Sequence, residues 1–154
     1  MTEVTGSNPQ MVEFIPTGKK HHPLSYATKL SSGIDLRAAL GKNKSVTIYP
    51  NQHVLIETGY SCKLDPSVEG QIRSRSGLAL KFGIIVLNAP GTIDADYEGP
   101  VSVILQNVSV DPFVVYDGDR IAQFVLCPVL REQAYMQAEP IERGEGGFGS
   151  TGVN

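Results

Sequence analysis

GTIDADYEG, residues 91–99, lies between two runs rich in β-branched residues, IIVL at 84–87 and VSVIL at 101–105. Two such runs joined by a connection that begins and ends in glycine predict a long antiparallel hairpin. The tip of this hairpin is expected to project Asp94 and Tyr97 toward a neighbouring cavity. A solvated acidic turn is the alternative, because aspartate and glycine are common in exposed turns.

Short apolar or alternating runs recur along the whole chain, and turn formers such as Asp65-Pro66 and Asp111-Pro112 separate them. This rhythm is typical of an all-β sandwich or barrel with antiparallel strands. The predicted strands are 11–15, 34–38, 46–49, 53–58, 71–73, 84–87, 101–108, 113–116 and 121–126. Residues 76–82 predict one short helix of about two turns. The pattern by itself does not distinguish a jelly roll from a Greek-key barrel.

The chain has 154 residues, of which 41% are hydrophobic, and this predicts a single domain with an ordinary core. Its net charge of -3 gives no general attraction for nucleic acid. No apolar run approaches the roughly 18 residues of a membrane span, and residues 1–10 do not resemble a secretion signal, so we expect a cytoplasmic protein that binds no membrane. Cys62 and Cys127 lack Cys-x-x-Cys spacing and are expected to be reduced thiols rather than zinc ligands.

Five glycines occur within nine residues near the C-terminus: Gly144, Gly146, Gly147, Gly149 and Gly152. We therefore expect residues 1–142 to form the domain and residues 143–154 to form a flexible C-terminal arm. Glycine lets backbone N–H groups approach phosphate oxygens, and Arg143 adds a cation that can bind two oxygens at once. The G-x-G-x-x-G spacing in this segment lacks the strand and the helix of a dinucleotide-binding turn. A disordered tail is the alternative.

Four further segments accompany residues 91–99 along the chain. They are SGIDLRA at 32–38, RSGLA at 75–79, GDRIAQ at 118–123 and RGEGGFGSTG at 143–152. Together the five segments resemble the sequence motifs of the trimeric deoxyuridine triphosphatases (dUTPases), and the resemblance extends over nearly the whole chain. It implies a distorted antiparallel jelly roll of the dUTPase-like β-clip type, and a homotrimer whose active sites are shared between subunits.

The resemblance also implies a reaction. Such an enzyme uses Mg²⁺ and hydrolyses dUTP to dUMP and pyrophosphate, which limits uracil in DNA and supplies dUMP for thymidylate synthesis. Attack by water at the α-phosphorus requires a group that orients or deprotonates the water. We expect Asp94 to be this catalytic residue, while Asp96 and Glu98 face the solvent.

Arg75, Ser76 and Gly77 lie where a predicted strand meets the predicted helix, and a helix N-terminus favours anions. A serine that caps the helix is the alternative. The resemblance implies that these residues and Gln123 hold the phosphate chain. The arm is expected to add phosphate contacts from Arg143, Gly149, Ser150 and Thr151. The family often has proline where this chain has Ser74, and this departure is expected to loosen the approach to Arg75.

The hairpin is expected to select the base. Backbone groups at Thr92 and Ile93 and the side-chain amide of Asn88 are expected to pair with the uracil edge, next to a wall that excludes the methyl group of thymine. By resemblance, Tyr97 packs under the deoxyribose and leaves no room for a 2′-hydroxyl. A tyrosine that only fills the core is the alternative. Phe148 of the arm is expected to stack on uracil, a contact worth about 1–3 kcal/mol.

Asp35 resembles the first-motif aspartate of the magnesium site, and we expect it to act through water, because Mg²⁺ keeps several waters and prefers phosphate oxygens. A buried aspartate that satisfies a backbone turn is the alternative. Asp119 and Arg120 are expected to pair with each other within the core. His21 and His22 form no ligand set with a cysteine or an acidic cluster, and we expect both to be exposed.

Two rival functions share the expected fold or site. A dCTP deaminase of the same fold requires an acid–base glutamate that faces C4 of the pyrimidine, whereas the hairpin of this chain offers Asp94 and Tyr97, which favours hydrolysis. A protein that keeps the nucleotide site but acts by contacting a regulator is the second rival. No long insertion between the motifs supports that second reading.

Overall fold

The structure, a computed structural model, describes residues 11–130, and residues 1–10 and 131–154 lie outside this description. The described chain forms short strands and one helix. In chain order they are β1 (Val12–Pro16), β2 (Ser25–Tyr26), β3 (Gly33–Arg37), β4 (Ser45–Ile48), β5 (His53–Leu64), β6 (Val68–Arg73), α1 (Ser76–Phe82), β7 (Ile84–Val86), β8 (Gly91–Ile93), β9 (Pro100–Asn107), β10 (Phe113–Tyr116) and β11 (Arg120–Pro128).

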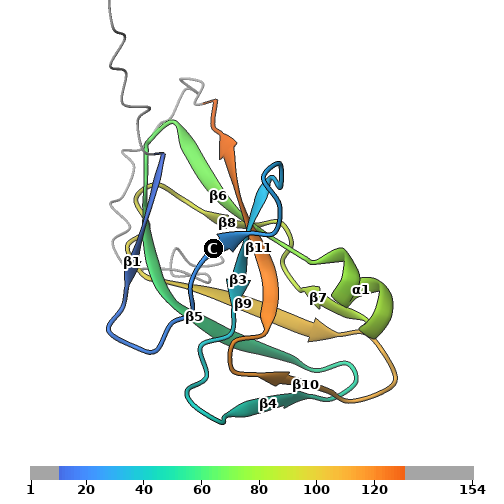
Figure 1. Ribbon diagram of the computed structural model, residues 1–154. Helices are drawn as coiled ribbons and strands as arrows, with labels where there is room; N and C mark the ends of the chain where they lie inside the picture. Colours follow the sequence, from blue (N-terminus) through green and yellow to red (C-terminus); the bar gives the residue numbers. More distant parts are fainter. Residues whose placement is uncertain (1–10, 131–154) are drawn as a thin grey trace, which may run out of the picture.

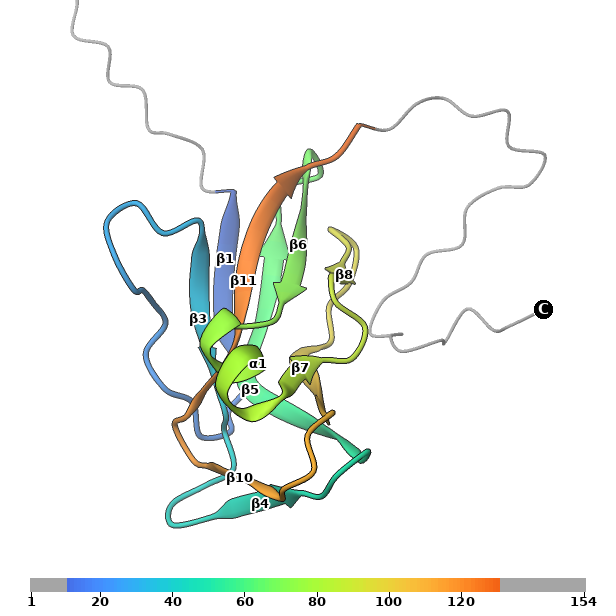
Figure 2. The ribbon, with the colours of Figure 1, turned by 90° about the vertical axis from the view of Figure 1, so that its right-hand side faces the viewer.

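The strands pair antiparallel in three sheets (Figure 1). The strand order is β1-β5-β9-β7 in one large sheet, β2-β3-β11-β6-β8 in the other, and β10-β4 in a small sheet. Figure 1 shows β4 and β10 together at one end of the molecule, and Figure 2 shows α1 lying close to β7. Antiparallel pairing confirms the predicted all-β class, and α1 has the bounds that the sequence predicted.

The core lies between the two large sheets, and alternation along the strands supplies it. Val101, Val103 and Leu105 of β9 are at most 1% exposed, because every second side chain of a strand points to the same face. Leu36 of β3 and Phe124 of β11 bring equally buried side chains from the other sheet into the same cluster. Each buried side chain of this size contributes roughly 1.5–3 kcal/mol relative to an exposed one.

The predicted hairpin forms only in part. β7 and β9 pair as expected, with Ile85 opposite Gln106. The residues between them leave the hairpin, however, because β8 joins the edge of the other large sheet, where Thr92 lies opposite Gln71 of β6. Pairing with β6 gives the backbone groups of this segment partners that an isolated hairpin tip lacks. The connection from β7 to β9 therefore bridges the two large sheets.

β5 is longer than the sequence predicted, since it continues past Thr58 to Leu64. Its pairing with β9 shifts between Glu57 and Ser61, and Gly59 within this irregularity has a φ of 79°. Glycine adopts this left-handed backbone without the cost of a Cβ, so the strand bends and continues along β1 instead of ending. β6 likewise begins earlier than predicted, and the two-residue β2 was not predicted.

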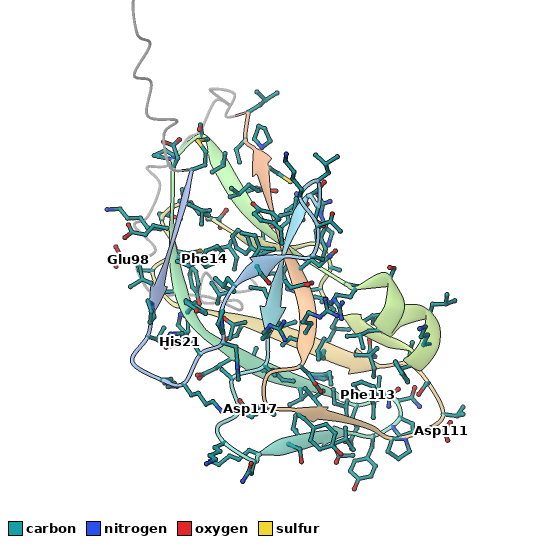
Figure 3. The ribbon with its side chains drawn as sticks, viewed as in Figure 1. Phe14, His21, Glu98, Asp111, Phe113 and Asp117 are labelled. Carbon is teal, nitrogen blue, oxygen red and sulfur yellow. The ribbon has the colours of Figure 1, made fainter. Side chains whose placement is uncertain are left out.

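Asp117, in the turn between β10 and β11, holds three loops together (Figure 3). Its Oδ1 accepts hydrogen bonds from the backbone N–H groups of Leu40 at 3.0 Å and Gly41 at 3.1 Å. Lys20 pairs with Oδ2, and His22 Nε2 lies 3.1 Å from Oδ1. The contact with Lys20, followed by those with His22 and Gly41, holds the pKa of Asp117 well below its ordinary value.

The two histidines differ from each other, and only one matches its prediction. His21 is exposed as expected, and its ring meets that of Tyr60 edge to face with centroids 5.0 Å apart. His22 is half-buried instead, because its ring packs beside Gly118 and against the carboxylate of Asp117. The sequence contains no local signal for this contact, which joins residues 95 positions apart.

Both cysteines are free, as predicted. Cys62 is buried in β5, and burial raises the pKa of its thiol to about 11, so this thiol stays protonated and unreactive at neutral pH. Within residues 11–130, no helix is long and apolar enough to cross a membrane.

Candidate functional site

Asp35, in the middle of β3, is a buried carboxylate that is only 1% exposed. Arg75 Nε lies 3.3 Å from its Oδ1, and Arg120 Nη1 lies 3.1 Å from its Oδ2. Burial of a carboxylate is costly unless cations and hydrogen bonds compensate it, so the two guanidinium groups explain how the sheet tolerates this charge. The alternative of a backbone turn is therefore wrong for Asp35.

Arg75 and Arg120, called the arginine pair below, keep part of their surface in solvent. Their side chains are 23% and 42% exposed, and Arg75 Nη1 also donates to the carbonyl oxygen of Arg120 at 3.1 Å. Two positive charges thus share one carboxylate, which leaves an excess positive charge at the surface. Guanidinium groups bind phosphate oxygens through two parallel hydrogen bonds, so the arginine pair is suited to a phosphate chain.

The expected pairing of Asp119 with Arg120 is wrong, and neither residue lies in the core. Both are exposed, and Asp119 Oδ2 accepts a hydrogen bond from the backbone N–H of Tyr116 at 2.8 Å, which closes the turn before β11. Arg120 was consequently not among the predicted site residues. Its position directly beside Asp119 gave a misleading signal, because adjacent side chains of an extended chain point in opposite directions.

Strand register places Gln123 beside Asp35, the carboxylate that the arginine pair contacts. Gln123 of β11 lies opposite Asp35 of β3 on one side and Arg73 of β6 on the other. Directly opposed residues of antiparallel strands point to the same face of the sheet, so these three side chains form a row across it. Gly33 leaves space for this row, since a Cβ there would lie 3.0 Å from Cβ of Gln123.

Residues 74–77, called the anion loop below, link β6 to α1. Arg75 is the N-cap of α1 with an extended backbone (φ -86°, ψ 125°), and no side chain caps the helix, so the alternative role of Ser76 as a cap is wrong. Ser76 and Gly77 are exposed, and a Cβ at Gly77 would meet nothing within 4 Å. The first backbone N–H groups of a helix have no partner inside it, so the loop presents donors beside the arginine pair.

Ser74, which was predicted to loosen the approach to Arg75, instead attaches this loop to a neighbouring strand. Its Oγ accepts a hydrogen bond of 2.8 Å from the backbone N–H of Val86 in β7. This bond joins the anion loop to the edge of the first large sheet. The serine therefore adds an attachment that a proline side chain, which has no hydrogen-bonding atom, is unable to provide.

The turn after β8 forms a second cluster, around Asp94 and Tyr97. The backbone N–H of Tyr97 donates to the carbonyl oxygen of Asp94 at 3.1 Å, which closes a four-residue turn. The Tyr97 side chain is 8% exposed, and its hydroxyl donates to the carbonyl oxygen of Pro100 at 3.1 Å. The ring packs directly on Gly99, where any Cβ would overlap it. The hydroxyl end of this ring is thus held in one position.

The acidic side chains of this turn separate as predicted. Asp94 is half-buried, whereas Asp96 and Glu98 are exposed, and Figure 3 shows Glu98 at the outer edge of the molecule. A half-buried carboxylate in a rigid turn is better suited than an exposed one to hold a water molecule in one orientation.

Asn88, Thr92 and Ile93 lie next to this turn. Asn88 is exposed after β7, and its Nδ2 lies 3.1 Å from the position that a Cβ would take at Gly91. Thr92 and Ile93 belong to β8, which pairs with β6 on one side only. The outward backbone groups of an edge strand are available to a planar ligand with donors and acceptors.

Five predicted site residues lie outside the described residues: Arg143, Phe148, Gly149, Ser150 and Thr151. The predicted boundary between domain and arm at residue 142 lies outside them as well.

A model of the dUTPase family matches residues 19–152 of this chain. The deoxyuridine 5′-triphosphate nucleotidohydrolase of Bartonella bacilliformis is 49% identical over 142 residues, with 82% of this chain and 80% of the relative covered. The enzyme of the same name from Methylocella silvestris is 44% identical over 145 residues, with 92% and 90% covered. That from Neorickettsia sennetsu is 48% identical over 142 residues, with 90% and 93% covered.

Solved structures show the same fold. A variant of the dUTPase of the staphylococcal phage 80α matches with a TM-score of 0.74 and 22% identity, covering 92% of this chain and 99% of that chain. A variant of the dUTPase of phage phi11 of S. aureus, which is described with a structural Mg(II) ion, matches with a TM-score of 0.71 and 18% identity, covering 83% and 97%. These matches confirm the predicted distorted jelly roll.

Proposed function

The chain belongs to the dUTPase family, and we propose from this premise that it hydrolyses dUTP to dUMP and pyrophosphate. The observation that carries the proposal beyond family membership is the arginine pair on buried Asp35. Its excess positive charge lies beside the anion loop, where a triphosphate requires cations and N–H donors. In the proposed arrangement the phosphate chain binds at this cluster, and the base and sugar bind along the segment from Asn88 to Tyr97.

Asp94 is the proposed catalytic residue. Its carboxylate orients a water molecule and accepts a proton from it as the water oxygen bonds to the α-phosphorus. The bond between the α-phosphorus and the oxygen that bridges to the β-phosphorus then breaks, and pyrophosphate leaves with the electron pair. Arg75, Ser76, Gly77 and Gln123 stabilise the charge that develops on the phosphate oxygens.

Tyr97 is the proposed sugar-selecting residue, and this role is supported by the rigidity of its ring. The hydrogen bond to Pro100 and the contact with Gly99 prevent the ring from moving away from a bulkier sugar. A ribose 2′-hydroxyl would meet this fixed ring, whereas deoxyribose fits. Asn88 and the backbone of Thr92 and Ile93 would pair with the edge of uracil.

Magnesium is the proposed cofactor, and the support for it is the donor set around Asp35. Among the described residues, no group of three or more His, Cys, Asp or Glu side chains could enclose a metal. Asp35 Oδ1 makes no hydrogen bond within the described structure, although Arg75 lies close to it, so this oxygen can accept one from a metal-bound water. The residues therefore fit an ion that the phosphates carry and that Asp35 contacts through water. Bound there, Mg²⁺ would neutralise phosphate charge.

A homotrimer with shared sites and a covering C-terminal arm complete the proposal. The support is the resemblance of the five motifs to those of the family. The last of these motifs, residues 143–152, contains predicted site residues such as Arg143 and Phe148. Phe148 would stack on uracil, and Arg143, Gly149, Ser150 and Thr151 would bind phosphates. A cytoplasmic location is also proposed, and the free thiols of Cys62 and Cys127 agree with a reducing compartment.

The direct test offers each deoxynucleoside triphosphate, and UTP, to the protein with Mg²⁺ and identifies the products by chromatography. The proposal expects dUMP and pyrophosphate from dUTP, and little turnover of dTTP or UTP. Formation of dUTP and ammonia from dCTP would support the deaminase instead. Absence of turnover with every nucleotide, together with tight binding of dUTP, would support the regulator-binding rival.

A further inference from the structure

Ser74 connects two parts of the molecule that the chain keeps twelve residues apart. It follows the last residue of β6 and precedes Arg75, the N-cap of α1. α1 has only seven residues, none of them buried, and no side chain caps its start. A helix this short has little stability of its own, and its position therefore depends on the contacts at its ends.

The N–H group that Ser74 binds belongs to an edge strand. β7 is the last strand of its sheet, and Leu87, the residue after β7, donates its N–H to Ile104 of β9 at 2.9 Å. Because successive N–H groups of a strand point to opposite sides, the N–H of Val86 points away from β9. The side chain of Val86 is 2% exposed, so this donor lies at a buried position where an unpaired N–H is costly.

The base-side turn, defined as residues 87–91, has attachments of its own that do not involve Ser74. Ala89 N–H donates to the carbonyl oxygen of Val86 at 3.2 Å, and Asn88 packs on Gly91. Loss of the serine hydroxyl therefore removes the hydrogen bond that attaches the anion loop to Val86, but leaves these contacts of the base-side turn in place. The two halves of the substrate should respond differently to such a change.

We propose that Ser74 is a positioning residue for phosphate binding: its hydroxyl fixes the anion loop, and with it Arg75 and Ser76, to the rigid sheet at Val86. This inference rests on the proposed hydrolysis of dUTP for its kinetic consequence only. A displacement of about 1 Å in a group that positions a substrate can reduce the rate by up to 100-fold. A proline at residue 74 would restrict the loop through the fixed φ of its ring rather than through a hydrogen bond.

The test compares Ser74→Ala, which removes the hydroxyl, with Ser74→Thr, which retains it. Ser61→Ala is the matched control, because the hydroxyl of Ser61 in β5 also joins two segments: it donates to the carbonyl oxygen of Ile15 in β1 at 3.4 Å. The measurements are kcat and KM for dUTP, inhibition constants for inorganic pyrophosphate and for deoxyuridine, and amide hydrogen exchange at Val86.

Ser74→Ala is expected to lower kcat/KM about 10- to 100-fold, to weaken pyrophosphate binding by a similar or smaller factor, and to leave deoxyuridine binding within about two-fold. The Val86 amide should exchange faster. Ser74→Thr and Ser61→Ala should stay close to wild type.

The proposal is overturned if Ser74→Ala binds pyrophosphate like wild type, if its affinities for pyrophosphate and deoxyuridine fall equally, or if Ser74→Thr loses as much kcat/KM as Ser74→Ala. Failure of the wild type to hydrolyse dUTP would overturn the proposed function alone, since pyrophosphate binding and amide exchange would still decide the role of Ser74.

Discussion

At the scale of single residues, the site depends on contacts between distant positions. Asp35 and Arg120 are 85 residues apart, and they meet because β3 and β11 are neighbours in one sheet. The sequence indicated Asp35 and Arg75 through their motifs, but it did not indicate that both arginines bind the same carboxylate. The two contacts follow from the pairing of β11 with β3 and with β6, which joins distant parts of the chain and which no local pattern of charges encodes.

Asp94→Asn is expected to fold normally, to bind the non-hydrolysable analogue α,β-imido-dUTP with nearly wild-type affinity, and to lose most of its turnover. The amide keeps the shape of the side chain but is unable to accept the proton of the attacking water. A positioned general base contributes typically 10²–10⁴-fold, so kcat should fall by about that factor. Steady-state kinetics measure the change. Retention of more than about a tenth of the wild-type rate would exclude Asp94 as the base.

Asp96→Asn serves as the matched control for this prediction, because Asp96 belongs to the same turn but is exposed. It removes an equal charge at nearly the same place, so any general electrostatic effect on the substrate should appear in both variants. We expect Asp96→Asn to keep kcat within about three-fold of wild type, a range that is small against the 10²–10⁴-fold effect of a base.

At the scale of elements, the sequence predicted those that local signals determine. α1 was predicted to its exact bounds, since a strand pattern ends before it and Gly83 ends it in the left-handed conformation with a φ of 62°. The path of β8 was not predicted, because the choice of β6 as partner is decided by packing of the two large sheets. Similarly, the sequence predicted a strand that ends at Thr58, whereas the folded chain bends at Gly59 and continues to Leu64.

The loop connection at Asp117 predicts an acid-sensitive contribution to stability. Asp117→Asn should lower the free energy of unfolding by about 1–3 kcal/mol near pH 7, because the negative charge that the carboxylate brings to its contacts with Lys20 and His22 is lost. The folded-state pKa of Asp117 is depressed, so this contribution is complete above the unfolded-state pKa of about 4 and is lost as the pH falls below it toward the folded-state value. The difference between variant and wild type should therefore shrink in acid.

Urea denaturation at pH 6 and at pH 2.5 measures this difference. Asp111→Asn is the control, because Asp111 is an exposed aspartate of the loop between β9 and β10 (Figure 3), and it should change stability by less than about 0.5 kcal/mol at both pH values. An Asp117→Asn protein that is as stable as wild type at pH 6, or whose deficit grows in acid, would contradict the role given to this carboxylate.

At the scale of the whole molecule, the segment from β7 to β9 joins the two large sheets and carries the base-side residues, while the anion loop lies at the junction of β6 and α1. The site is thus built on loops and turns whose flanking strands belong to the packed core. The all-β class and the jelly roll could be predicted, because the motifs extend over most of the chain. Subunit sharing of the site and the action of the arm remain predictions.

Truncation after Glu142 tests the arm. We expect the shortened protein to keep its melting temperature and its oligomeric mass, a trimer by light scattering, because residues 143–154 hold Phe148 as their one large apolar side chain. Its turnover of dUTP should fall at least 100-fold, since stacking on uracil and several charge-assisted phosphate contacts are lost together. A truncated protein that hydrolyses dUTP at the full-length rate would show that the arm takes no part in the reaction.

Hydrolysis of dUTP in water enriched in ¹⁸O tests most directly the central claim that water attacks the α-phosphorus. Mass spectrometry of the separated products after a single turnover locates the oxygen that came from water. The account predicts one ¹⁸O atom in the phosphate of dUMP and unlabelled pyrophosphate. Label in pyrophosphate with unlabelled dUMP would mean attack at the β-phosphorus, and release of labelled inorganic phosphate would mean attack at the γ-phosphorus; either result would contradict the account.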